Sequence, residues 1–217
     1  MRGVVFDFDG VIANSEPLHE AALRAAAREL GMDFTHAQYL STYIGFDDRG
    51  VLGALARQHG KRLTEHETDS FHERKRRAFL RVVEDGGVTP FPGSVELIRA
   101  AADRGPVAVC SGARRHEIEP ILDALGVRAL MKTIVSADDV ALSKPHPESY
   151  IRTAERLGVP SKALVAIEDT PAGIESALGA GYRVAAVCHS VPANELTRAH
   201  RVFGSMAEVT VRELERV

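Results

Sequence analysis

The chain has 217 residues, 45% hydrophobic and 26% charged, a composition typical of a soluble globular protein with one elaborated domain or two small ones. Its formal net charge of -3 supplies no overall basic field, which argues against nucleic acid as a partner. No apolar run approaches the roughly 18 residues that a membrane-spanning helix needs, so we expect no membrane partner.

The first predicted element is a buried strand that ends in two aspartates. The apolar run 4–6 is followed at once by Asp7, Asp9 and Gly10. Side chains alternate along a strand, so these carboxylates point the same way and repel each other unless a cation lies between them. The segment predicts a Mg²⁺ site at a strand end, where open α/β sheets bind ligands. By itself it fits an exposed Asp-x-Asp-Gly turn equally well.

Residues 15–85 show no strand pattern. Leu18, Ala22 and Ala26 recur at helical spacing, and Gly31 ends that run. Further helices are predicted over 35–44, 47–59 and 64–85. We therefore expect an inserted α-helical cap domain of residues 15–85, and a core domain of residues 1–14 and 86–217.

The second half of the chain alternates between strands and helices. Such alternation predicts βαβ units, and therefore a Rossmann-like α/β core with a parallel sheet. A last helix is predicted over 205–216. The strands are expected at 106–111, 133–136, 163–169 and 183–187, and the other helices at 94–103, 114–125, 147–157 and 171–180.

Polar residues follow two later strands, as the aspartates follow the first. Ser111 and Gly112 come after one strand, and Glu168 and Asp169 end another. Lys144 lies in a loop on the same predicted edge. The carboxyl ends of parallel strands share one edge, so these groups should converge.

This set of groups matches phosphoryl transfer through a covalent intermediate. A carboxylate attacks phosphorus, and a cation neutralises the developing charge. Lysine, hydroxyl and backbone donors hold the phosphoryl oxygens, and a second acid protonates the leaving oxygen.

Taken together, the motifs resemble those of the haloacid dehalogenase superfamily, in the branch with a helical cap, and the resemblance covers nearly the whole chain. It implies that Asp7 is the nucleophile and Asp9 the general acid/base. The four matching segments are Asp7-Phe8-Asp9-Gly10-Val11, Ser111-Gly112, Lys144-Pro145 and Glu168-Asp169-Thr170-Pro171-Ala172-Gly173.

The resemblance also implies the ligand-binding groups. Ser111, Gly112 and Lys144 would bind the phosphate. Mg²⁺ is the expected cofactor, held by the acids of the first and fourth motifs: Asp7, Asp9, Glu168 and Asp169. We further expect the substrate phosphate to be the counter-ion of Lys144, so that removing Lys144 would stabilise the free protein.

Asp9 bears on the reaction, because dehalogenases of this superfamily typically lack the second aspartate. Its presence implies phosphate ester chemistry. In the cap, His19 and Arg49 resemble positions that handle a phosphosugar in the β-phosphoglucomutase subgroup, with Lys75 a looser match. All three also fit solvated helix residues, and the run 74–77 reads as a solvated helix face.

The leading prediction is Mg²⁺-dependent hydrolysis of a small phosphorylated metabolite, such as a sugar phosphate, through an aspartyl phosphate. The alternative is a sugar phosphomutase of the β-phosphoglucomutase type. A phospho-signalling receiver module uses similar groups, but its phosphoacceptor would follow a mid-domain strand in a chain of about 120 residues. Asp7 lies too early for that.

Cysteine spacing and the early first strand bear on compartment. Cys110 and Cys188 lie in apolar runs without a C-x-x-C spacing, which predicts buried thiols in a reducing compartment. No signal peptide is expected before the first strand. We expect a cytoplasmic protein, either a monomer or a weak dimer.

Overall fold

The computed structural model describes residues 1–43 and 48–217, and the chain divides into two compact units. The core unit comprises Met1–Ser15 and Val88–Val217, and the helical unit comprises Glu16–Gly87. Among the described residues, no helix is both long and apolar enough to cross a membrane. That the helical unit acts as a lid stays a prediction, as do the cytoplasmic location and the oligomeric state.

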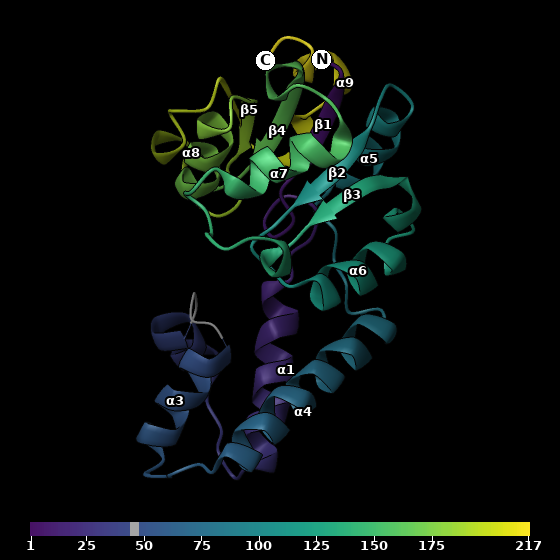
Figure 1. Ribbon diagram of the computed structural model, residues 1–217. Coiled ribbons are helices and arrows are strands. Elements are labelled where there is room, and N and C mark those ends of the chain that lie inside the picture. The colour runs from purple at the N-terminus through teal and green to yellow at the C-terminus, as the bar shows by residue number, and fades with distance from the viewer. Residues whose placement is uncertain (44–47) are drawn as a thin grey trace. The chain divides into compact units, whose positions relative to one another are not determined.

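The core unit is built on a parallel sheet of six strands in the order β3-β2-β1-β4-β5-β6 (Figure 1). This arrangement confirms the predicted Rossmann-like α/β fold. The first strand lies in the middle, between β2 and β4. The strands are β1 (Gly3–Phe6), β2 (Val107–Cys110), β3 (Met131–Val135), β4 (Leu164–Glu168), β5 (Arg183–Val187) and β6 (Arg201–Phe203).

Helices cover the sheet, which explains why its central strands are continuous apolar runs. Every residue of β1, β2 and β4 is buried. Tyr150 of α7 (Glu148–Leu157) and Ile174 of α8 (Pro171–Gly179) belong to the same buried hydrophobic cluster as Val5 and Ala166 of the sheet. The core helices are α5 (Ser94–Ala102), α6 (Arg115–Ala124), α7 (Glu148–Leu157), α8 (Pro171–Gly179) and α9 (Val211–Leu214).

The predicted helix over 205–216 is wrong. The chain forms the edge strand β6, then a 3₁₀ turn at Met206–Glu208, and only then the short α9. Thr210 interrupts the predicted helix, because its side chain accepts a hydrogen bond from Glu213 N and so begins a new helix. The edge strand, which has only three residues, was missed.

The helical unit contains α1 (Glu16–Glu29), α2 (His36–Gln38), α3 (Asp48–Gln58) and α4 (Glu65–Glu84). Helices α1 and α4 pack together. The predicted helix over 35–44 is α-helical only through Gln38 and continues as a π-helical turn, Tyr39–Tyr43. The last residue of that predicted helix, and the first residue of the helix predicted over 47–59, lie outside the described residues.

The two cysteines differ in burial. Cys110, in β2, is buried, as predicted. Cys188, just after β5, is only half-buried, so the prediction of a buried thiol is wrong there. The apolar run of β5 ends in a turn at Cys188, which leaves the cysteine side chain at the edge of the core.

Candidate active site

The strand order changes direction at β1, and the carboxyl ends of β1, β2 and β4 meet there. Open α/β sheets bind ligands at such a point. Asp7 directly follows β1, and its backbone N–H donates to Ile167 O at 2.9 Å. Ser111 directly follows β2 and donates its N–H to Val135 O, also at 2.9 Å. These backbone hydrogen bonds therefore fix the backbone positions of Asp7 and Ser111 at the ends of their strands.

Lys144 reaches into this edge and contacts two carboxylates. Its Nζ lies 2.6 Å from Asp7 Oδ1 and 2.6 Å from Glu168 Oε1, and donates to Cys110 O at 3.0 Å. Burial alone would lower the lysine pKa, but the two carboxylates outweigh it and raise the pKa well above its usual value. The expectation that substrate phosphate is its counter-ion is wrong for the free protein, because Asp7 and Glu168 already neutralise it.

Glu168 is fully buried and hydrogen-bonded at both oxygens. Oε1 accepts from Tyr150 OH at 2.8 Å as well as from Lys144, and Oε2 accepts from Thr170 Oγ1 at 3.3 Å. The backbone of α8 comes so close that a Cβ at Gly173 would lie 1.9 Å from Oε2. Glu168 is therefore a fixed anchor for Lys144, with little freedom of its own.

Asp7 and Asp169 form a metal-compatible cluster with Glu168, since one oxygen from each lies within 4.8 Å of the others. Burial raises the pKa of Asp7 well above its usual value, helped by the neighbouring carboxylates. Burial also raises the pKa of Asp169 to about 7. Among the described residues, no group donates to the buried Oδ1 of Asp169. Crowded carboxylates with an unsatisfied oxygen fit a hard divalent cation.

Asp9 lies on the turn after the nucleophile position, half-buried. The hydroxyl of Ser15 donates to Asp9 Oδ1. Gly10 follows with a φ of 79°, a left-handed conformation that glycine adopts without strain. Sequence reasoning did not assign Ser15 to the site, because nothing local shows that the chain folds back over the turn.

Ser111, Gly112 and Lys144 line a pocket of about 170 Å³ together with Ser149 and residues of the 137–143 loop. Ser111 Oγ accepts a hydrogen bond from Ala113 N at 2.9 Å, which fixes the side chain and leaves its proton to donate elsewhere. Asp9, also predicted as a metal ligand, lies outside the three-carboxylate cluster. The structure thus brings six of the predicted core residues to one edge of the sheet: Asp7, Ser111, Gly112, Lys144, Glu168 and Asp169.

The helical unit holds the other predicted residues. Lys75 is 2% exposed, so its assignment to a solvated helix face is wrong. Its Nζ lies 3.2 Å from His19 Nδ1 and 3.2 Å from Asp48 Oδ2, which accounts for burying the charge. Arg49, on α3, is exposed. His19, Lys75 and Asp48 therefore form one polar cluster, and Arg49, the residue after Asp48, is exposed to solvent.

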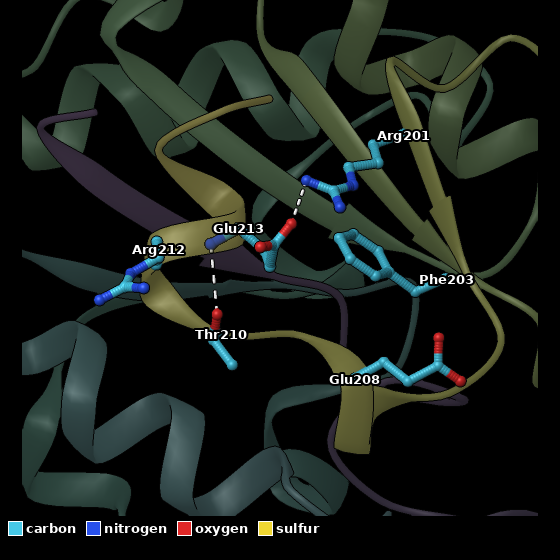
Figure 2. Close-up of a pocket in the computed structure, with 6 residues that line it drawn as sticks. All are labelled: Arg201, Phe203, Glu208, Thr210, Arg212 and Glu213. Carbon is cyan, nitrogen blue, oxygen red and sulfur yellow. Dashed lines mark hydrogen bonds and ion pairs between the residues drawn. The ribbon is translucent and has the colours of Figure 1, made fainter.

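Another hollow, of about 600 Å³, lies at β6 and α9. Figure 2 shows Arg201 pointing toward Glu213, with which it forms an ion pair, while Arg212 points away. The Arg201 guanidinium also lies 4.9 Å from the Phe203 ring centroid. Because its inward charges are already paired, this hollow lacks the excess charge of the strand-end site.

Comparisons with known proteins agree with this geometry. The model of the family described as haloacid dehalogenase-like hydrolase matches residues 4–187. The chain belongs to this family. The predicted recognition and enzyme class, a phosphatase of the haloacid dehalogenase type, are confirmed.

Similar proteins match over most of the chain. The "Phosphorylated carbohydrates phosphatase" of Thermotoga maritima is 30% identical over 194 residues, 88% of this chain and 87% of that protein. "Protein SUPPRESSOR OF QUENCHING 1, chloroplastic" of Arabidopsis thaliana is 34% identical over 86% of this chain, but the match spans only 18% of the plant protein. The crystal structure of CbbY from Rhodobacter sphaeroides in complex with phosphate superposes with a TM-score of 0.84, at 26% identity and 99% coverage of both chains.

Proposed function

We propose that this chain hydrolyses phosphate monoesters of small phosphorylated metabolites, in a Mg²⁺-dependent reaction that passes through an aspartyl phosphate on Asp7. The observation that carries the proposal is the Asp7 carboxylate at the end of β1, 2.6 Å from Lys144 Nζ and clustered with Asp169. A carboxylate so placed can attack phosphorus while the lysine holds a phosphoryl oxygen.

The buried acids fit the expected cation. Asp7 and Asp169 would hold it, with Asp9 close by, since Asp169 Oδ1 has no donor in the part of the chain that the structure describes. Glu168, also predicted as a ligand, already accepts hydrogen bonds at both oxygens, so we assign it mainly to holding Lys144. Bound Mg²⁺ would supply charge neutralisation for the phosphoryl group and the carboxylates.

The chain's own residues would carry two steps. An oxygen of Asp7 bonds to phosphorus as the ester P–O bond breaks, and Asp9 gives its proton to the leaving oxygen. Lys144, Ser111 and the backbone at Gly112 donate to the phosphoryl oxygens. Asp9 then takes a proton from water, whose oxygen attacks phosphorus and releases Asp7 and inorganic phosphate. The hydroxyl of Ser15 keeps Asp9 oriented in both steps.

Hydrolysis of an aryl phosphate tests the proposal. Asp9→Asn should lower kcat/KM, which covers the steps up to formation of the aspartyl phosphate, by about 10²- to 10⁴-fold for a substrate with a poor leaving group, the usual weight of general acid/base catalysis. The loss should be smaller for an aryl phosphate whose leaving group needs no proton. An equal loss on both substrates would contradict the role of Asp9 as the acid.

The substrate class is argued from relatives. The Thermotoga relative is named for phosphorylated carbohydrates, and it matches nearly the whole of this chain. We infer that the substrates here are also sugar phosphates. Purified protein assayed against panels of phosphorylated sugars, nucleotides and amino acids should release phosphate fastest from the sugars. Preference for another panel would overturn the inference.

A sugar phosphomutase is the second candidate, favoured by one observation. Lys75 is buried in contact with His19, which strengthens the match to the β-phosphoglucomutase pattern. A mutase must keep water from the aspartyl phosphate and bind a second phosphate, a task for which Arg49 is the exposed candidate. Arg49→Ala should then abolish conversion of β-glucose 1-phosphate to glucose 6-phosphate and spare aryl phosphate hydrolysis. In a simple phosphatase it should shift KM for the native substrate, with a modest effect on kcat.

A further inference from the structure

The turn after β5 contacts the candidate site from a segment that none of the four motifs includes. It contains His189 and Ser190, which directly follow the half-buried Cys188. The backbone N–H of Cys188 donates to Phe203 O at 3.1 Å, which ties the turn to β6. The side chains of His189 and Ser190 instead contact the turn after β1 and Asp169, the acid after β4.

His189 is held on three sides. Its Nε2 accepts a hydrogen bond from Met206 N at 3.3 Å, and its Nδ1 lies 2.7 Å from Gly10 O. Because Nε2 accepts, it carries no proton, so the neutral ring must donate from Nδ1 to Gly10. The ring also stacks on Phe91, with centroids 4.0 Å apart and planes 17° apart. Both ring nitrogens of His189 therefore have a hydrogen-bond partner.

Gly10 is the point where the turn after β1 meets the acid after β4. A Cβ at Gly10 would lie 1.7 Å from Asp169 Oδ2 and 3.0 Å from Ser190 Oγ. Gly10 N donates to Ala13 O at 3.2 Å, which closes the turn behind Asp9. Holding the Gly10 carbonyl therefore sets how close this turn comes to Asp169.

Ser190 acts on Asp169 directly. Its hydroxyl donates to Asp169 Oδ2. The other oxygen, Oδ1, is buried, and no described group donates to it. The serine thus fixes one oxygen of Asp169, and the other stays available to a cation. Partners of this kind orient metal ligands, and removing them typically costs about 10- to 100-fold in affinity.

We propose that His189 and Ser190 are positioning residues for Mg²⁺: His189 holds the Asp7–Gly10 turn through the Gly10 carbonyl, and Ser190 orients the Asp169 carboxylate. The inference rests on the proposed function for the identity of the cation. It extends that function to a fifth segment, residues 188–190, whose only sequence signal is its place after β5. A purely structural alternative is that the turn does no more than join β5 to β6.

Paired variants separate the two hydrogen bonds of His189. The amide nitrogen of Asn can take the place of Nδ1 and donate to Gly10, whereas Gln reaches toward the place of Nε2 and leaves Gly10 without its donor. Ser190→Ala removes the hydroxyl and Ser190→Thr keeps it. His200→Gln is the matched control, because His200 Nδ1 accepts from Val184 N at 3.0 Å at the other end of β5.

The experiment measures Mg²⁺ affinity by titration calorimetry on the substrate-free full chain, with kcat, KM and a thermal melt for each variant. H189Q and S190A should raise the Mg²⁺ Kd about tenfold or more, with the loss in kcat reduced at saturating Mg²⁺. H189N and S190T should stay within about threefold of wild type. H200Q should melt at a lower temperature and keep its Mg²⁺ affinity.

The possible failures are distinguishable. Wild-type Kd in both H189Q and S190A, with wild-type protein binding Mg²⁺ and hydrolysing phosphate esters, would overturn the positioning roles and leave the proposed function standing. Wild-type protein that neither binds Mg²⁺ nor hydrolyses would overturn both. If H189Q does not fold, the contrast between S190A and S190T and the affinity of H189N decide the question.

Discussion

Two acidic clusters lie at the same edge of the core sheet and are built in opposite ways. Asp139, just after β3, accepts from Arg115 Nη2 at 2.7 Å, Arg156 Nη2 at 2.7 Å and Ser136 N at 2.9 Å. Burial opposes its charge, but these hydrogen bonds outweigh burial and hold its pKa well below the usual value. Burial instead raises the pKa of Asp7, where neighbouring carboxylates add to the effect.

The difference lies in charge balance. Around Asp139, arginines meet the acids, and its carboxylate oxygens are satisfied by protein donors. At the strand-end site, the acids Asp7, Glu168 and Asp169 share the single ammonium group that the described residues supply there, from Lys144. A cluster balanced by the chain contributes to stability, whereas one left negative is poised to bind a cation and a substrate.

The sharpest test of this contrast is Asp7→Asn. It should lower phosphate ester hydrolysis by about 10⁴-fold or more, because an amide cannot form the acyl phosphate. It should also raise the melting temperature of the Mg²⁺-free protein, since a crowded carboxylate is removed. Asp139→Asn is the control and should do the reverse: near-normal kcat with a lower melting temperature. A D7N protein with wild-type turnover would show that the nucleophile is misassigned.

Lys144→Met probes the balance from the cationic side. It leaves Asp7 and Glu168 facing each other without their ammonium partner, and breaking a buried pair in this way costs about 3–5 kcal/mol. Urea unfolding of the free protein measures the loss. This reverses the expectation from sequence that removing Lys144 would be stabilising. The surface variant Lys162→Met should have little effect. An unchanged or raised unfolding free energy in K144M would restore the earlier expectation.

The sequence could predict the site where local pattern and topology together place a residue. Asp7, Ser111 and Asp169 each follow an apolar strand, and parallel strands bring such positions to one edge. No detailed contact was needed to expect them together. Lys144 lies in a loop, so topology predicts only that it lies at the same edge, and its role in binding phosphate is implied by the family resemblance.

Contacts between distant segments could not be predicted in the same way. His189 lies 179 residues from the Gly10 it contacts, and nothing in a turn after a strand indicates that partner. Lys75 lies in a run of basic residues, which predicts a solvated side chain. Its burial depends on contacts with His19 and Asp48, which are distant in sequence. At the C-terminus, one helix is predicted over 205–216, yet a 3₁₀ turn comes first and Thr210 then starts a short new helix.

Adding and removing Mg²⁺ should separate the clusters by stability. At 100 times its Kd, Mg²⁺ should raise the free energy of unfolding of wild-type protein by about 2.7 kcal/mol, because it binds the folded state. Asp139→Asn should keep that gain, and Asp169→Asn should lose most of it. EDTA should abolish hydrolysis in wild-type protein and in D139N alike. Full activity in EDTA would contradict the Mg²⁺ requirement. Loss of the stability gain in D139N would place the Mg²⁺ site at the Asp139 cluster.

The smallest expected effect is the pH dependence of the Asp139 cluster. Asp139→Asn should cost about 1.5–3 kcal/mol near pH 7, the range for a hydrogen bond to a charged group. The folded-state pKa lies below the unfolded value of about 4, so this stabilisation is present above pH 4 and is lost as pH falls through the folded-state pKa. The stability difference between wild-type protein and D139N should therefore be constant from pH 7 to 5 and shrink below pH 4, in urea unfolding at each pH. A difference that stays constant down to pH 3 would mean that packing around Asp139, and not its charge, stabilises the loop after β3, and the contrast between the two clusters would then rest on the strand-end site alone.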